Sequence, residues 1–293
     1  MKIGASAPIF DKEIIMLKRS DIHIRDPFIL PDDGKYYMYA SNGHGFMVYV
    51  SEDLEHFTEP TVVFNPPEGF WATRDYWAPE VHKYNGAYYL FASLKSDTAC
   101  RGTQIFKAES PMGPFALHSD GPVTPRDWEC LDGTLYIEDG TPYMVFCHEW
   151  LQVKDGEMCA IRLTADLSAP VGEPIVLFRA SEPVWAKSVR NGTDFVTDGP
   201  FMYRTASGRL MMIWSSFAAD GYCEGLAYSD NGSIAGKWYH DERLLFKKDG
   251  GHGMIFKTFE GKMQFICHQP NKSPLERAAM VGLCEKDDSL FVE

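Results

Sequence analysis

The sequence contains no uninterrupted apolar run of the roughly eighteen residues that a membrane helix needs. Its start, MKIGASAPIFDKEII, also lacks the apolar core of a secretion signal. Positive charge is scarce, because 28 lysines and arginines face 41 aspartates and glutamates and give a formal net charge of −13. Nucleic-acid-binding proteins gain affinity from basic surfaces, so we expect neither a nucleic-acid partner nor a membrane partner. We predict a cytoplasmic protein, or a periplasmic or secreted one if a signal peptide has been removed from the sequence.

Metal-binding cysteine pairs are also missing, since the seven cysteines include no CxxC spacing. Five cysteines lie in or beside segments with the composition of β-strands: Cys147, Cys159, Cys223, Cys267 and Cys284. We therefore expect buried free thiols in a reducing compartment. No pair of histidines has zinc-ligand spacing either, so we interpret four of them as strand or loop residues: His23, His44, His82 and His148.

An internal repeat runs through nearly the whole chain. Five similar aromatic-rich or apolar segments each follow a turn glycine, and these glycines are Gly34, Gly86, Gly140, Gly208 and Gly261. A partner strand precedes each glycine, and a further strand pair follows in most repeats. About four strands in a unit of roughly fifty residues is typical of a β-propeller blade. We predict an all-β fold, a five-bladed β-propeller with roughly four antiparallel strands per blade, forming a single catalytic domain over residues 1–293.

Carboxylates recur near the first strands of the repeats. They are Asp26, Glu80, Asp132 and Asp198, and the fifth repeat offers His252. In a propeller the first strands line a central channel, so these side chains are expected to converge on one site. Burying several carboxylates together costs free energy unless they are paired, hydrogen-bonded or needed for catalysis. Asp26 alone could be a turn residue, but four carboxylates at related positions indicate a functional site.

The motifs around these carboxylates resemble those of glycoside hydrolase family 43, whose members are five-bladed propellers. The resemblance covers essentially the whole chain and is carried by four short segments in order: Arg25-Asp26-Pro27, Trp77-Ala78-Pro79-Glu80-Val81, Leu131-Asp132-Gly133 and Asp198-Gly199-Pro200. It implies inverting hydrolysis of a glycosidic bond. In that reaction a base activates water on one face of the sugar while an acid protonates the leaving oxygen on the other.

The resemblance also assigns roles to single residues. It implies that Asp26 is the general base, that Asp132 orients the acid and tunes its pKa, and that Asp198 is the general acid. His252 matches a histidine that, in this family, helps to hold a metal ion in the channel. We expect a hard cation, calcium or sodium, at His252, because a histidine in a water-filled channel would hold the ion mainly through water.

Two residues depart from the family pattern. The family usually has glutamate in the Glu-Gly-Pro motif of the acid, whereas Asp198 is shorter by one methylene. Glu224, in GYCEGLAYS, and Glu149, in CHEW, are the alternative acids. Glu80 stands where the family more often has aspartate, and we interpret it as a substrate or structural contact.

Further substrate contacts are expected from aromatic and basic residues. Tryptophans stack on sugar rings but also pack between blades, and the candidates are Trp71, Trp77, Trp128 and Trp150. Trp128 is the preferred platform because it lies four residues before Asp132. Arg277, in LERAAM, is either a substrate contact or a surface arginine. The predicted substrate-binding set is Trp77, Glu80, Trp128, Glu224 and Arg277.

The resemblance favours an exo-acting α-L-arabinofuranosidase that removes terminal units from plant polysaccharide side chains, as in xylan degradation, or from oligosaccharides. β-Xylosidase and β-galactosidase activities occur on similar scaffolds, so they remain alternatives. A retaining fructan or phosphorolytic enzyme and a non-catalytic carbohydrate-binding propeller are further alternatives. A binding module has no need of three converging acids, and neutralising Asp26 would leave its ligand affinity nearly intact.

Overall fold

Turn residues determine where each repeat reverses direction. A two-residue hairpin turn of type I′ needs positive φ at both positions, which aspartate, asparagine and glycine tolerate best. In the first three repeats the paired φ values are 45° and 75°, 47° and 82°, and 48° and 78°, at Asp33-Gly34, Asn85-Gly86 and Asp139-Gly140. Each of these turns joins the first two strands of a blade.

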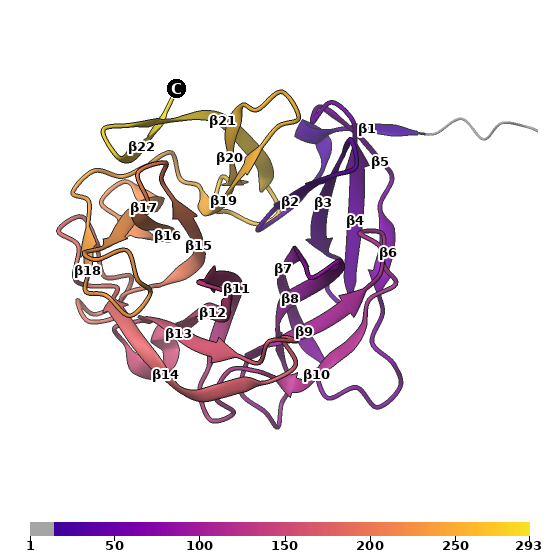
Figure 1. Ribbon diagram of the computed structural model, residues 1–293, viewed down its shortest axis with the longest axis horizontal. Helices are drawn as coiled ribbons and strands as arrows, with labels where there is room; N and C mark the ends of the chain where they lie inside the picture. The colour runs from indigo at the N-terminus through magenta and orange to yellow at the C-terminus, as the bar shows by residue number, and fades with distance from the viewer. Residues whose placement is uncertain (1–14) are drawn as a thin grey trace, which may run out of the picture.

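The computed structural model describes residues 15–293. Five antiparallel sheets stand around a common axis as the blades of a propeller (Figure 1). This confirms the predicted all-β, five-bladed fold. No helix within residues 15–293 has the length and apolar character to cross a membrane.

The first blade has six strands rather than four, because β1 and β6 add to the sheet. Its order is β1-β5-β4-β3-β2, with β6 paired to β4. A 3₁₀ turn, η1 (Arg19–Asp21), follows β1. The strands are β1 (Met16–Lys18), β2 (Phe28–Asp32), β3 (Lys35–Ser41), β4 (Phe46–Ser51), β5 (His56–Thr58) and β6 (Thr61–Phe64).

Each of the other four blades has the four strands that the repeat predicts. The second contains β7 (Arg74–Tyr84), β8 (Ala87–Lys95), β9 (Gly102–Ala108) and β10 (Ala116–Pro122). The third contains β11 (Cys130–Glu138), β12 (Thr141–His148), β13 (Glu157–Leu163) and β14 (Pro170–Arg179). The fourth contains β15 (Asp198–Arg204), β16 (Leu210–Ala218), β17 (Gly221–Ser229) and β18 (Trp238–His240). The fifth contains β19 (Gly251–Lys257), β20 (Met263–Gln269), β21 (Arg277–Lys286) and β22 (Ser289–Val292).

The first strands of the blades, β2, β7, β11, β15 and β19, contact one another in turn around the axis, and β19 contacts β2. The segment before β2 closes the ring against blade five. Arg19 donates through Nη1 to the carbonyl of Ala278 at 3.1 Å, and the Ile24 amide donates to the carbonyl of Glu276 at 3.3 Å. The closed ring therefore holds the segment that carries Asp26 against the last blade.

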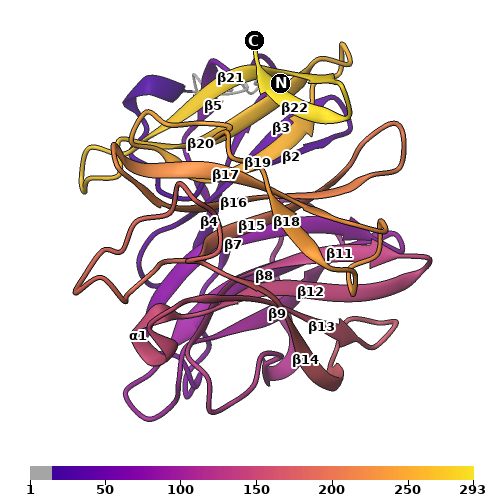
Figure 2. The ribbon, with the colours of Figure 1, turned by 90° about the vertical axis from the view of Figure 1, so that its left-hand side faces the viewer.

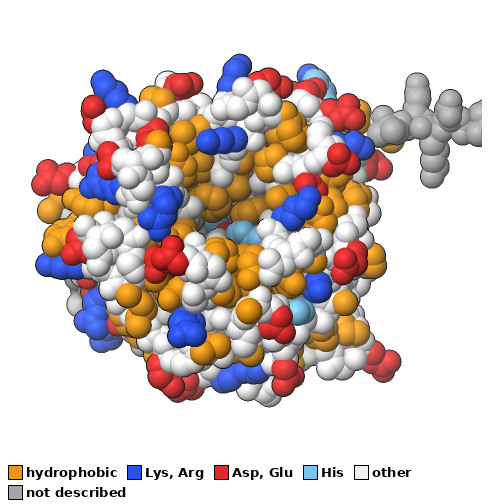
Figure 3. Space-filling model, in the orientation of Figure 1, with side chains coloured by type: hydrophobic (Ala, Val, Ile, Leu, Met, Phe, Trp, Pro, Cys, Tyr) orange, Lys and Arg blue, Asp and Glu red, His pale blue; other side chains and the backbone are white. Residues whose placement is uncertain are grey.

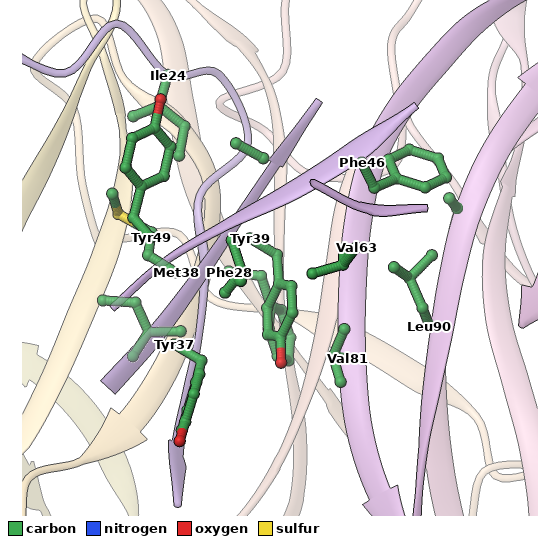
Figure 4. Packing of buried hydrophobic residues seen from close by; sticks show 14 of the residues in the cluster. Ile24, Phe28, Tyr37, Met38, Tyr39, Phe46, Tyr49, Val63, Val81 and Leu90 are labelled. Atoms are coloured by element: carbon green, nitrogen blue, oxygen red, sulfur yellow. The ribbon is translucent and has the colours of Figure 1, made fainter. Parts of the chain in front are cut away.

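Aromatic and aliphatic side chains fill the space between blades. Tyr39 and Phe46 of blade one belong to the same buried cluster as Val81 and Leu90 of blade two (Figure 4). The ring centroids of Phe46 and Phe106 lie 6.1 Å apart, which is within the range of favourable aromatic pairs. Packing of this kind fixes the blades relative to one another, and so fixes the strand ends that meet at the axis.

The two faces of the ring carry different elements. The short helix α1 (Trp150–Val153) lies on one face and the β11–β12 turn on the opposite face (Figure 2). A space-filling view of one face shows a central hollow bordered by hydrophobic side chains (Figure 3).

Candidate active site

The first strand of every blade begins with the same backbone irregularity. A residue with positive φ occurs shortly before the strand or within its first five residues: Asp26 (51°), Ala78 (45°), Asp132 (57°), Gly199 (49°) and His252 (49°). In β7, β11, β15 and β19 the strand pairing shifts register around this residue. Such bulges redirect side chains and are frequent next to active sites.

These strand starts line one pocket of about 480 Å³. It brings together five of the predicted site residues: Asp26, Asp132, Asp198, His252 and Trp77. Trp150, one of the tryptophan candidates, also lines it, as do two residues with no predicted site role, Arg25 and Tyr222. Glu149, an alternative acid in the sequence analysis, lies in the same wall as Trp150.

Asp26 is surrounded by cationic or potentially cationic groups. Its Oδ1 lies 3.0 Å from His268 Nδ1, 3.3 Å from His252 Nδ1 and 3.8 Å from Arg25 Nε. Burial opposes ionisation of the carboxyl, but the two histidines and Arg25 outweigh it and hold the pKa of Asp26 well below its usual range. Asp26 is therefore a carboxylate at neutral pH, as a general base must be.

Asp132 contacts residues of three other blades, the second, the fourth and the fifth. Its Oδ2 accepts a hydrogen bond from the Gly199 amide at 3.0 Å and lies 3.5 Å from His252 Nδ1. Its own amide donates to Ser93 Oγ at 2.8 Å. Burial and the neighbouring charge of Asp26 raise the pKa of Asp132 well above its ordinary value.

Asp198, like Asp132, is a carboxyl whose environment favours a proton. Burial and the charge of Asp132 raise the pKa of Asp198 to about 8. The Tyr222 hydroxyl donates to Asp198 Oδ2 at 3.0 Å and partly opposes this rise. One pocket thus holds an ionised aspartate and an aspartate that keeps its proton near neutral pH, which is the division of labour between a base and an acid.

Two of the predicted substrate contacts, Glu80 and Trp128, do not line the pocket. Glu80 is buried and its Oε2 lies 3.0 Å from His82 Nε2, so it supports the packing of blade two. Trp128 stacks on the ring of His148 at 4.1 Å instead of facing the pocket. Neither residue lines the pocket, so the structure does not bring them to a sugar bound there.

Glu224 is also outside the pocket and is fully buried. Its Oε2 accepts hydrogen bonds from Ser215 Oγ at 2.6 Å and from the Gly253 amide at 3.2 Å. Ser215 Oγ in turn accepts from the His252 amide at 2.6 Å. Glu224 therefore pins the bulge that presents His252, and it has no access to a leaving group.

Arg277 has a structural environment as well. Its guanidinium donates to the backbone carbonyls of Ser20 at 3.1 Å and Glu276 at 2.8 Å. The bond to Ser20 joins blade five to the segment before β2, whereas the bond to Glu276 is local. Arg277 lies outside the pocket, and its contact with a substrate stays a prediction.

The sequence predicts a calcium or sodium ion at His252. The Nδ1 of this histidine lies within 3.5 Å of both Asp26 and Asp132, so the ring faces two carboxylates. Within residues 15–293, no group of three or more histidine, cysteine, aspartate or glutamate side chains has an arrangement that could hold a metal ion. The described side chains alone thus do not form a cation cage, and calcium or sodium at His252 stays a prediction.

Both the sequence and the fold of this chain match those of known proteins. The model of glycosyl hydrolases family 43 matches residues 21–288. The crystal structure of endo-arabinase from Bacteroides thetaiotaomicron VPI-5482 is 39% identical, with a TM-score of 0.89, and the match covers 94% of this chain and 99% of that chain.

Two curated relatives are more distant. α-L-Arabinofuranosidase 43 from Humicola insolens is 22% identical over 94% of this chain and 61% of that protein. Extracellular endo-α-(1→5)-L-arabinanase 1 from Bacillus subtilis (strain 168) is 21% identical over 45% of each chain. The chain therefore matches less than two thirds of the length of either curated relative.

Proposed function

The chain belongs to glycosyl hydrolases family 43, and we propose that it hydrolyses α-L-arabinofuranosyl linkages of plant polysaccharides or oligosaccharides with inversion. One observation carries the proposed chemistry: Asp26 and Asp198 face one pocket with their pKa values shifted in opposite directions. The choice of sugar is supported by the 39% identity to a protein named as an endo-arabinase.

Asp26 acts as the general base. Its carboxylate takes a proton from a water molecule while the water oxygen attacks the anomeric carbon from the face opposite the leaving group. His268 and His252 fix the orientation of this carboxylate through contacts at 3.0 and 3.3 Å. These contacts also keep Asp26 ionised in a buried position, where an unpaired carboxylate would be protonated.

Asp198 acts as the general acid. As the glycosidic bond breaks, it gives its proton to the departing oxygen, which would otherwise leave as a poor alkoxide leaving group. Tyr222 holds the carboxyl through the hydroxyl bond at 3.0 Å and stabilises the carboxylate that forms. Proton exchange with solvent then restores an ionised Asp26 and a protonated Asp198.

Asp132 connects these two groups. Its Oδ2 binds the Gly199 amide directly after Asp198, and its charge raises the pKa of Asp198. Asp132 therefore positions and tunes the acid without itself exchanging a proton with substrate.

The mode of chain cleavage has two candidates. The family resemblance favours exo action on terminal arabinofuranosyl units. The 39% identical structure carries the name endo-arabinase, and this observation favours cleavage within a chain as the second candidate. Linear α-1,5-arabinan separates the two modes, because exo action releases arabinose alone from the start whereas endo action first releases a series of oligosaccharides.

The experiment that tests the function compares aryl α-L-arabinofuranoside with aryl β-xyloside and aryl β-galactoside as substrates, and follows product configuration by proton NMR before mutarotation. The proposal expects activity on the arabinofuranoside and a first product of inverted configuration. Retention, or a clear preference for the xyloside or galactoside, would contradict it.

A further inference from the structure

A charged cluster stands behind one wall of the pocket, between blades two and three. Arg101 is only 5% exposed, and its Nη1 pairs with Glu149 Oε2 while its Nη2 donates to Asp75 Oδ2 at 2.9 Å. The guanidinium also lies 4.4 Å from the centre of the Trp77 ring. Neither the proposed base nor the proposed acid depends on this cluster, so its presence beside the pocket calls for another role.

Glu149 and the residue after it are rigidly held. The Glu149 amide donates to the carbonyl of Glu129 at 2.8 Å, and the next residue, Trp150, begins α1. Gln152 of the same helix accepts from the Glu129 amide at 2.7 Å. The guanidinium of Arg190 lies 5.1 Å from the Trp150 ring. This part of the wall is therefore preformed.

Both Glu149 and Trp150 line the pocket, and so does Trp77, which is 43% exposed. Arg101 occupies Oε2 of Glu149, and among the described residues no hydrogen bond reaches Oε1. A carboxylate that lines a pocket together with two tryptophan rings suits a neutral sugar. Sugar hydroxyls donate to the oxygen while the apolar ring face packs on an indole.

The wall lies further from the propeller axis than the proposed catalytic acids. His148 pairs with Cys130 in the ladder between β11 and β12, so Glu149 follows the second strand of blade three whereas Asp132 belongs to the first. A sugar in contact with Glu149 and Trp150 is thus displaced outward from the sugar whose bond is cleaved at Asp26 and Asp198.

Glu149 is poorly suited to be the acid itself. Burial raises the pKa of Glu149, with Arg101 opposing the rise. Its Oε2 is committed to a buried guanidinium, and donation of a proton from this carboxyl would have to compete with that ion pair. Asp198 has only a tyrosine hydroxyl as a hydrogen-bond partner among the described residues.

We propose that Glu149, clamped by Arg101 and flanked by Trp77 and Trp150, forms a binding subsite for a second, neutral sugar residue of the substrate. This inference rests on the proposed function, since it assigns the wall to the chain that the enzyme cleaves. Arg101 is a positioning residue, because it acts through Glu149 and Trp77.

Calorimetric titration of linear α-1,5-arabinotriose into the Asp26→Asn protein tests the subsite without turnover. Adding Glu149→Gln keeps the shape and the bond from Arg101 but removes the charge that sugar hydroxyls would meet. Hydrogen bonds to charged groups contribute enough that we expect Kd for the triose to rise roughly tenfold to a hundredfold. The rise in Kd should be much smaller for the monosaccharide arabinose. Trp150→Ala should show the same dependence on chain length.

Glu157→Gln is the matched control. Glu157 lies in the same blade and is paired with Arg179 at 3.0 Å and with His148 at 3.0 Å, but it does not line the pocket. Its replacement should leave the Kd for the triose unchanged. An equal rise in the Kd for the triose in Glu157→Gln would assign the effect to the packing of blade three and overturn the inference.

Three other outcomes are decisive. An unchanged Kd for the triose in Glu149→Gln would overturn the subsite while leaving the proposed function intact. Loss of turnover on oligosaccharides with retention on a dinitrophenyl glycoside, at unchanged Kd, would make Glu149 the acid and also overturn it. If the Asp26→Asn protein bound no arabinose oligosaccharide, the proposed function would be wrong, and the titration would be repeated with xylotriose. Weaker binding of xylotriose after Glu149→Gln would then support the subsite, and unchanged binding would overturn it.

Discussion

Replacing Tyr222 with phenylalanine should move the alkaline limb of the pH profile upward. The Tyr222 hydroxyl donates to Asp198 Oδ2 at 3.0 Å, and this bond favours the ionised form of the acid. The ring itself stacks near His268, with centroids 5.5 Å apart, and phenylalanine keeps that contact. The substitution therefore removes one hydrogen bond and little else.

The size of the shift follows from the strength of that bond. Hydrogen bonds to charged groups contribute about 1.5 to 3 kcal/mol, and one pKa unit corresponds to about 1.36 kcal/mol. The pKa of Asp198 is about 8 with the bond present, so without it the value should rise by roughly one to two units. Because the acid works in its protonated form, activity should persist to a higher pH.

The assay is the pH dependence of kcat/KM, which reports the pKa values of the free enzyme. Tyr228→Phe is the control, because Tyr228 lies on the same strand, stacks against Tyr239 at 5.9 Å and does not line the pocket. An alkaline limb that stays in place in Tyr222→Phe, or moves to lower pH, would refute the assignment of Asp198 as the acid held by Tyr222.

Three further predictions concern Asp26, Asp198 and Arg277. Asp26→Asn keeps the shape of the base but not its basicity, so kcat should fall by roughly 10²-fold to 10⁴-fold on oligosaccharides and aryl glycosides alike; near-normal rates would reduce Asp26 to a turn residue. Asp198→Asn should raise the free energy of unfolding at pH 7 by up to a few kcal/mol in urea titrations. Because the pKa of Asp198 is raised in the folded state, the wild-type protein must bind a proton on folding at pH 7, which costs free energy that the Asp198→Asn protein avoids. The gain in stability should vanish near pH 3, where Asp198 is protonated in both the folded and the unfolded state. Arg277→Met removes the bond to Ser20 that joins blade five to the segment before β2, so it should lower the unfolding free energy by about 1 kcal/mol while KM stays constant; a raised KM at unchanged stability would instead support the predicted substrate contact.

The sequence predicts the fold well because its turn residues are local signals. Pairs such as Asn85-Gly86 specify a hairpin turn without reference to the rest of the chain. The same regularity predicts that Asp26, Asp132 and His252 meet, since each is the residue with positive φ near the start of its blade's first strand. The two additional strands of blade one have no such signal, because β1 and β6 are short and lie outside the repeat.

Glu80 shows where the pattern misleads. The bulge of blade two falls at Ala78, so Glu80 lies two residues beyond the position equivalent to Asp26 and pairs opposite Phe91 in the ladder. The register shift between Trp77 and Glu80 interrupts the regular alternation, and Glu80 contacts His82 inside the blade instead of lining the pocket. The positive φ at an alanine is not readable from the sequence.

Other site residues come from strands that the repeat does not single out. Tyr222 begins the third strand of blade four, and His268 lies near the end of the second strand of blade five. Both reach the site because the blades converge there, which depends on the packing of the whole ring. The pairing of Arg101 with Glu149 likewise joins two blades across 48 positions and has no local signature.

The most direct test of the acid and base assignment is the rate of Asp198→Ala on two substrates that differ only in leaving group. A sugar alkoxide must be protonated as it departs, whereas a dinitrophenolate leaves unaided. The assignment predicts that Asp198→Ala loses most activity on arabino-oligosaccharides, keeps much of it on a dinitrophenyl α-L-arabinofuranoside, and loses the alkaline limb near pH 8. Equal losses on both substrates, or the same leaving-group dependence in Glu149→Ala or Glu224→Ala instead, would contradict it.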